Sequence, residues 1–178
     1  MRINKNLLKN SESFKNVEKD LNYIVSKIAQ DDILLKLLSL QENNMEPLSS
    51  EERKEILQKC IKIIPKIDNI NETDWSFIGI SFDNFVPNLE NPEYRDKTLI
   101  FDIICNFDTW NLGDFKLRPY QIAGRLDVLF DKQSLADTYT IDFMSAENII
   151  VDDEIAGVNL VYSVIYGKTS DIEKNNGI

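Results

Sequence analysis

The sequence predicts an α+β fold with a mainly antiparallel β-sheet, and three patterns support this. Helical apolar spacing fills the first third of the chain. Runs rich in β-branched and aromatic residues, with lengths typical of strands, dominate the remainder. One further amphipathic helix, expected at about residues 119–131, lies between two pairs of these strands. An order of three helices, two strands, one helix and two strands is typical of an α+β fold.

Three segments are expected along the 178 residues. Residues 1–66 form an N-terminal helical segment, and residues 67–166 form the α+β sheet domain. Residues 167–178 are poor in apolar residues and predict a flexible tail. The chain is long enough to bury a core of its own, and 43% hydrophobic and 28% charged residues are ordinary for a globular protein.

Two helices are expected before residue 41. The first covers about residues 13–29, and the second covers about residues 32–40 with Asp31 or Asp32 as its N-cap. The apolar stripe of the first helix should face the core or a neighbouring subunit. This stripe consists of Phe14, Val17, Leu21, Ile24 and Ile28.

A capping-box pattern predicts the start of the third helix. Glu52 follows Ser49 by three residues, so each side chain can accept a hydrogen bond from the other residue's backbone N–H. Cys60 and Ile64 then lie on one side of the helix, and Pro65 is expected to end it.

The chain is organised around one strand and one helix between residues 97 and 133. The run Thr98–Phe107 predicts a strand, and a turn-rich bridge leads from it to Pro119, a position where a first-turn proline is tolerated. The helix that follows repeats apolar residues at intervals of three and four. These residues are Ile122, Leu126, Leu129 and Phe130.

The other strands are expected at residues 75–82, 139–145 and 157–166, with a polar segment between the last two. Residues 83–96 contain two prolines and three asparagines, and predict a long irregular loop or a splayed hairpin. The apolar residues of this loop predict either that it packs back on its own domain or that it reaches a partner.

This chain lacks the residues that several catalytic mechanisms require. With no histidine, the chain lacks the commonest general base, which excludes hydrolase triads. Cys60 and Cys105 lie in separate apolar runs and predict buried thiols rather than a zinc site. The glycines are isolated, and the acids at 152–154 lack the spacing of a calcium loop, so we expect no nucleotide, metal or other cofactor.

Negative charge is concentrated in the sheet domain. Residues 1–66 hold 12 Lys and Arg against 10 Asp and Glu, a net charge of +2, whereas residues 67–178 hold 8 against 20, a net charge of −12. Such a field disfavours a nucleic-acid binder, although a generic solubility surface also explains it. With no membrane-length apolar run and no signal-peptide core, we expect a protein that matures in a cytoplasm without a membrane partner.

Asp102, Asp114 and Lys116 imitate the carboxylate and lysine pattern of metal-dependent nucleases. Two carboxylates can hold a magnesium ion, and a lysine can stabilise the charge of the attacked phosphate. However, Asp114 follows Gly113 in an expected turn rather than in a second buried strand, and the acidic surroundings oppose the approach of DNA. Unrelated surface charges are therefore the favoured interpretation.

Residues 99–107 (LIFDIICNF), 117–127 (LRPYQIAGRLD) and 156–166 (AGVNLVYSVIY) resemble small neck proteins of tailed phages, in particular tail-terminator and tail-completion proteins. This resemblance implies a non-enzymatic virion protein assembled in the cytoplasm of a bacterial host. It implies a closed ring, commonly of six subunits in terminators, that joins the tail tube to the head connector. Its partners are then other copies of the chain and other neck, connector and tail-tube proteins.

Under this hypothesis DNA passes through an acidic lumen without sticking, because like charges repel. The residues expected to make subunit or partner contacts are Phe85, Val86, Leu89, Tyr94 and Trp110. Two other functions stay open. An acidic DNA-mimic inhibitor predicts a monomer or dimer that binds a DNA-binding enzyme, and a magnesium nuclease predicts metal-dependent cleavage that Asp102→Ala abolishes.

Overall fold

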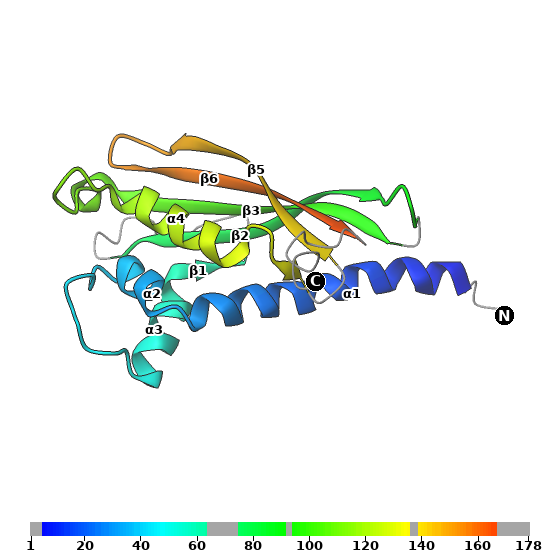
Figure 1. The fold of residues 1–178 in the computed structure, drawn as a ribbon, viewed down its shortest axis with the longest axis horizontal. Coiled ribbons are helices and arrows are strands. Elements are labelled where there is room, and N and C mark those ends of the chain that lie inside the picture. The colour runs from blue at the N-terminus through cyan, green and yellow to red at the C-terminus, as the bar shows by residue number, and fades with distance from the viewer. Residues whose placement is uncertain (1–4, 64–74, 92–93, 136–138, 167–178) are drawn as a thin grey trace, which may run out of the picture.

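The computed structural model describes residues 5–63, 75–91, 94–135 and 139–166, with residues 5–15 described as backbone only. Over these residues the α+β prediction is confirmed (Figure 1). The elements are α1 (Lys5–Ala29), α2 (Asp32–Leu38), α3 (Ser50–Cys60), β1 (Ile61–Lys62), β2 (Phe77–Pro87), β3 (Arg95–Asn106), the 3-10 turn η1 (Phe107–Thr109), α4 (Arg118–Phe130), β4 (Ser134–Leu135), β5 (Tyr139–Ile150) and β6 (Ile155–Tyr166).

The sheet is mainly antiparallel, as the sequence predicts. Its strand order is β1-β2-β3-β6-β5-β4, and only the two-residue β1 pairs in parallel with its neighbour. Directly opposite residues of antiparallel strands share a face. The row Phe82, Leu99, Tyr162 and Phe143 therefore lies on one face, and the neighbouring row Asp83, Thr98, Ser163 and Asp142 lies on the other.

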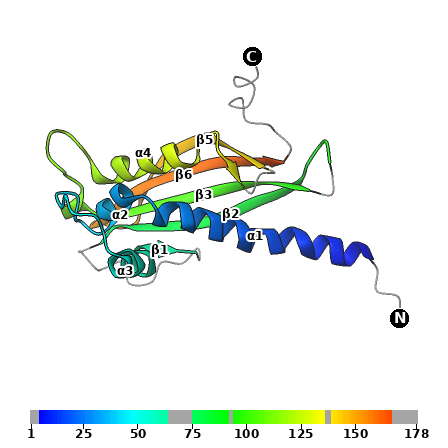
Figure 2. The ribbon, with the colours of Figure 1, turned by 60° about the horizontal axis from the view of Figure 1, so that its bottom comes forward.

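Helices cover only the first of these faces. Figures 1 and 2 show α1, α2 and α4 over one side of the sheet, with α3 beside β1 at its edge. We call this side the helix-covered face and the opposite side the outer face. The outer face comprises Phe77, Gly79, Ser81, Asp83 and Val86 of β2, Asp96, Thr98, Ile100, Asp102, Ile104 and Asn106 of β3, Thr140, Asp142, Ser145, Glu147 and Ile149 of β5, and Ile155, Gly157, Asn159, Val161, Ser163 and Ile165 of β6.

The predicted central strand and helix form the middle of the core. Helix α4 ends within one residue of its expected end, with Pro119 in its first turn. Ile122, Leu126 and Phe130 of α4 are buried against the helix-covered face. The Phe130 ring stacks on that of Phe101 with 5.2 Å between centroids, which fixes the helix over β3.

Two helix ends differ from their predictions. Helix α1 begins at Lys5 rather than near Ser13. Helix α3 ends at Cys60 instead of continuing to Pro65, because Ile61 adopts an extended backbone and pairs with β2. A β-branched residue suits this added edge strand. Pro65 itself lies outside the described residues.

The predicted caps are confirmed. The Asp31 carboxylate accepts a hydrogen bond from the Leu34 backbone N–H at 2.8 Å, which caps α2. Ser49 and Glu52 form the expected capping box at the start of α3. The hydrogen bond that the Ser49 backbone N–H donates to the Glu52 carboxylate, followed by that from the Ser49 hydroxyl, lowers the pKa of Glu52.

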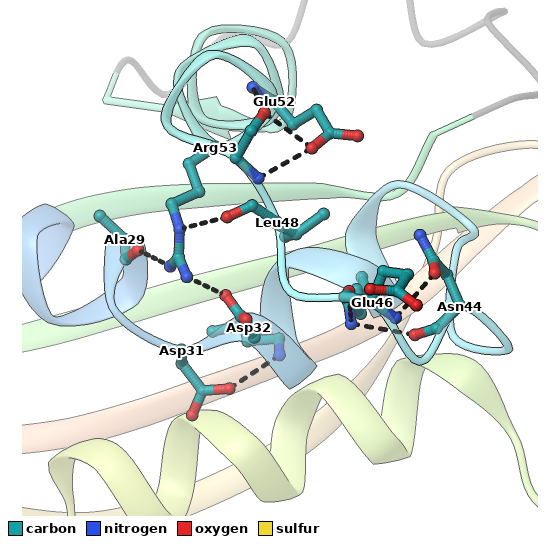
Figure 3. A network of polar contacts seen from close by, with 11 residues as sticks. Ala29, Asp31, Asp32, Asn44, Glu46, Leu48, Glu52 and Arg53 are labelled. Atoms are coloured by element: carbon teal, nitrogen blue, oxygen red, sulfur yellow. Dashed lines mark hydrogen bonds and ion pairs between the residues drawn. The ribbon is translucent and has the colours of Figure 1, made fainter.

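Arg53 connects the three N-terminal helices to one another (Figure 3). Its guanidinium donates to the backbone oxygens of Ala29, at 2.9 Å, and Leu48, at 3.3 Å, and forms an ion pair with Asp32. Since Arg53 lies on α3 and its partners lie on or beside the other two helices, this one side chain fixes their arrangement.

The prediction of a long loop over residues 83–96 is wrong in extent. Strand β2 continues through a bulge between Asp83 and Val86 to Pro87, and β3 begins at Arg95, so the connection is a hairpin with a shorter turn. The segment 146–156, expected to be a polar connection, is also mostly strand, because Ala146–Ile150 pair with β6. The expected tail at 167–178 lies outside the described residues.

Two ion pairs, one buried and one partly buried, join the helical segment to the sheet domain. Lys97 of β3 pairs with Asp20 of α1, and both side chains are buried. Arg125 of α4 pairs with Asp31. The core cluster contains residues from both segments, including Ile24 and Leu34 before residue 66 and Phe101 and Tyr162 after it. Among the described helices, none is long and apolar enough to cross a membrane.

Candidate interaction surfaces

The outer face is acidic. Its four long strands place five carboxylates on this face, and within these strands no lysine or arginine shares it. The two basic residues of β3, Arg95 and Lys97, point to the helix-covered face, where Lys97 is paired with Asp20. Positive charge reaches this face from outside the four strands. The Lys132 ammonium pairs with the buried Asp142 carboxylate at 2.8 Å, and Lys62 of β1 lies over the Phe77 ring. The carboxylates are Asp83, Asp96, Asp102, Asp142 and Glu147.

The central carboxylate belongs to a row that crosses the sheet. Gly79, Asp102, Asn159 and Glu147 lie directly opposite one another on β2, β3, β6 and β5. The Asn159 side-chain amide donates to the Asp102 carboxylate at 2.7 Å. Through the carboxylates of Asp102 and Glu147, the row presents negative charge and hydrogen-bond acceptors to anything that approaches.

The β2–β3 hairpin carries four of the five predicted contact residues. Leu89 is fully exposed at its turn and Val86 is exposed, whereas Phe85 is half-buried and Tyr94 packs against the core. Asn88 holds the turn, since its side-chain oxygen accepts from two backbone N–H groups and its amide donates to Asp96. The hairpin therefore packs back on the domain through Tyr94 and leaves Leu89 available for a partner.

The fifth predicted contact residue, Trp110, has partners within the chain. Its indole N–H donates to the Cys105 backbone oxygen at 3.3 Å, and its ring lies against Phe107. It is half-buried and packs on the core, so its contact with another subunit stays a prediction. The neighbouring thiol is buried as expected, and burial raises the pKa of Cys105 to about 11.

The loop Asn111–Leu117 presents an aromatic residue that the sequence analysis did not select. Gly113, Asp114 and Phe115 all have positive φ angles, of 85°, 49° and 61°. Backbone bonds from Leu112 N–H to the Lys116 oxygen and from Lys116 N–H to the Gly113 oxygen close the loop. The Phe115 side chain is fully exposed. Gly113-Asp114 is a turn signal that is visible in the sequence, but full exposure of Phe115 is not.

A hollow of about 220 Å³ lies between α4 and β5. A side-chain Cβ added at Gly124 would meet no atom within 4 Å, so the glycine leaves this hollow open. Asp127 is exposed at the rim of the hollow and accepts a hydrogen bond from the Tyr162 hydroxyl at 3.1 Å. The pKa of Tyr162 is raised, mainly by the burial of its hydroxyl and then by the negative charge of Asp127. Its lining residues are Ala123, Gly124, Asp127, Phe143 and Leu160.

The three residues of the nuclease hypothesis lie on different elements. Asp102 is on the outer face of β3 with its carboxylate bonded to Asn159, whereas Asp114 and Lys116 are exposed in the loop before α4. In the part of the chain that the structure describes, no three His, Cys, Asp or Glu side chains gather as a metal-ligand set.

One family model, YomW, matches the chain over residues 31–164, which is 134 of the 178 residues. The match runs from the start of α2 almost to the end of β6, so it includes the helix-covered and outer faces of the sheet. No curated protein matches the chain.

Proposed function

Since the chain belongs to the YomW family, a Bacillus phage-region family, and is phage-associated, we propose that it is a structural protein of the phage virion at the head–tail junction. In this role it is a tail-terminator-like or tail-completion-like subunit of a ring, and six subunits are the first ring size to test. Its partners are other copies of itself and the connector and tail-tube proteins.

One observation carries this proposal, namely that the four long strands place five carboxylates and no basic residue on the outer face, where Lys132 from outside these strands pairs with one of the five, Asp142. A face that lined the ring lumen in this way would repel the phosphates of passing DNA. Tight phosphate contacts by lysine or arginine would instead hold the DNA and slow its passage. The proposal therefore assigns the outer face to the lumen and the helices to the outside of the ring.

Imaging of purified virions tests the assignment. A subunit tagged after residue 178 and labelled with gold is expected to mark the junction of head and tail in every labelled particle. Untagged virions from the same host give the background. Label confined to the capsid surface or to the distal tail, or a subunit that is absent from washed virions, would overturn the proposal.

The same acidic face also supports a second function, a DNA-mimic inhibitor, because carboxylates on a sheet can occupy a phosphate-binding surface. This function predicts a monomer or dimer that is absent from the virion and forms a stable complex with a DNA-binding enzyme. Duplex DNA should then compete with the protein for that enzyme. Virion imaging and size measurement separate the two functions.

A further inference from the structure

We propose that copies of this chain bind one another head to tail, with Phe115 of one copy inserted into the α4–β5 hollow of the next. The ring rests on the proposed function, and this contact supplies the surface that would close it. The inference itself concerns self-association and stands on two surface features.

The first feature is a projecting aromatic residue on a fixed loop. Asp114 and Phe115 both hold positive φ angles, a backbone conformation that aspartate tolerates but phenylalanine rarely adopts. Backbone hydrogen bonds nevertheless close the loop around them. The outcome is a Phe115 ring that is fully exposed, although its burial would stabilise the monomer. An aromatic side chain that becomes buried on binding is a typical energetic centre of a protein–protein interface.

The second feature is a hollow that the chain leaves unfilled. Gly124 lies inside helix α4, where glycine is unfavourable compared with alanine. The packing of the chain does not require a glycine at this position, because an added Cβ would meet nothing within 4 Å. The glycine instead keeps the hollow open beside Phe143, whose ring is partly exposed. An entering aromatic ring can stack against Phe143 or meet its edge.

Charge complementarity identifies a second copy as the occupant. Lys116 follows Phe115 and is exposed, while Asp127 is exposed at the rim of the hollow. A docked Phe115 brings this positive charge to that negative charge, which favours the contact and its orientation. Because the projecting residue and the hollow are different surfaces, copies can join head to tail into a closed ring or an open filament, whereas a two-fold dimer would need both contacts to form reciprocally between the same two copies.

A disulfide trap tests the contact directly. Lys116→Cys protein is mixed with Asp127→Cys protein at about 1 mM, where even a contact with a millimolar Kd is populated, and oxidised mildly, so that Phe115 and Gly124 stay intact in both proteins. The native Cys60 and Cys105 are buried and stay inert. The mixture is expected to give a cross-linked heterodimer. Met45→Cys, which is also exposed, is the matched control, and its mixture with either protein should give about tenfold less product.

Several outcomes of the trap would overturn the proposal. One is a yield no greater than that of the Met45→Cys control, and another is a dominant cross-link between two Lys116→Cys copies, which would show that the loops of two copies face each other. An Asp127→Cys thiol that reacts with a small thiol reagent only after residues 167–178 are deleted would assign the hollow to the chain's own tail. A thiol that is blocked only by a connector or tail-tube protein would assign it to that partner.

Blocked surfaces provide an independent test by sedimentation. Phe115→Ser should weaken self-association about 30-fold or more, as expected for a central interface aromatic, and Gly124→Trp should fill the hollow. The equimolar mixture should form dimers and nothing larger, since each variant retains one intact surface. Met45→Trp, which adds the same ring at an exposed loop position, is the control and should leave association unchanged. Variants that associate as the wild type does contradict the proposal.

These measurements fail separately from the imaging of virions. A cross-link together with unlabelled virions would keep the self-contact and remove the head–tail role. Labelled junctions without a cross-link would keep the role and remove this contact.

Discussion

The two faces of this sheet are made by the same strands but follow different chemistry. Along β3, Leu99, Phe101 and Ile103 are fully buried under the helices. The alternating residues Ile100 and Asp102 on the outer face are only half-buried. The comparison teaches that adjacent residues of one strand serve separate purposes. The helix-covered set forms the main core. On the outer face, Phe77, Ile104 and Ile155 form a smaller buried cluster, and the exposed residues there are free to determine what the sheet meets.

The largest expected effect contrasts two neighbouring residues of β3. Phe101→Ala should lower the free energy of unfolding by about 3–5 kcal/mol, because it removes a fully buried ring stacked on Phe130 and leaves a cavity. Ile100→Ala, on the half-buried outer face, should cost about 1–2 kcal/mol. Urea unfolding measures both. Equal losses would show that the outer face is packed as tightly as the helix-covered face.

The next effect concerns the charged pair under α1. Lys97→Met should cost about 3–4 kcal/mol, because it leaves the buried Asp20 carboxylate without its partner. The double variant Asp20→Leu, Lys97→Met should recover most of this loss, since a buried ion pair is often replaced by apolar side chains without penalty. Urea unfolding of both variants is compared with that of Lys116→Met on the exposed loop, which should be neutral. No recovery in the double variant would mean that Lys97 stabilises mainly through cation–π contacts with Phe82 and Tyr139 rather than through its pair with Asp20.

A smaller effect is expected from Glu42, which fixes the start of α4. Arg118 donates two hydrogen bonds to its carboxylate, at 2.8 and 2.9 Å, and these lower the pKa of Glu42 below its ordinary value of 4.5. A lowered pKa stabilises the folded state above pH 4.5, and this contribution disappears as the pH falls through the folded-state value. Glu42→Gln should therefore cost about 1.5–3 kcal/mol at pH 7 and little at low pH.

Denaturant unfolding at a series of pH values measures this dependence. Glu46→Gln, in the same loop but exposed, is the control and should change the pH profile little. Glu42→Gln and wild-type curves that stay parallel down to low pH would contradict the role assigned to the Arg118 pair.

Local patterns predicted the parts of the fold whose contacts lie close in sequence. The helix at Arg118–Phe130 and the cap at Ser49 were predictable because spacing and capping involve residues within one or two turns. The strand at Ala146–Ile150 was missed because α4 does not cover it. Both faces of this strand are largely exposed, so its sequence shows no alternation of apolar and polar residues. Pairing with β6 alone makes this segment a strand.

The interaction surfaces were less predictable than the fold, for the same physical reason. The acidity of residues 67–178 was visible from composition, but its collection on one face depends on the registers of four strands. The pairing of Lys97 with Asp20 joins positions 77 residues apart, which no local pattern encodes. Likewise, Phe115 was indistinguishable from a core aromatic until the closed loop placed it on the surface.

The smallest expected change in stability tests the acidic face itself. Asp83→Lys with Glu147→Lys should alter the free energy of unfolding by about 0.5 kcal/mol or less, because both side chains are exposed. Duplex DNA should nevertheless bind this variant and not the wild type, with an affinity that falls steeply as salt is added, because each phosphate contact releases counterions. Fluorescence anisotropy at several salt concentrations measures this binding.

Glu46→Lys with Asp153→Lys is the matched control, because it makes the same change in net charge at exposed positions that lie off the outer face. If placement matters, this control should bind DNA much more weakly than the outer-face variant. If only the total charge matters, the two variants should bind alike, and the acids of the outer face would then be no more than a solubility surface. Because the two variants have identical net charge, their difference isolates the contribution of the sheet's geometry.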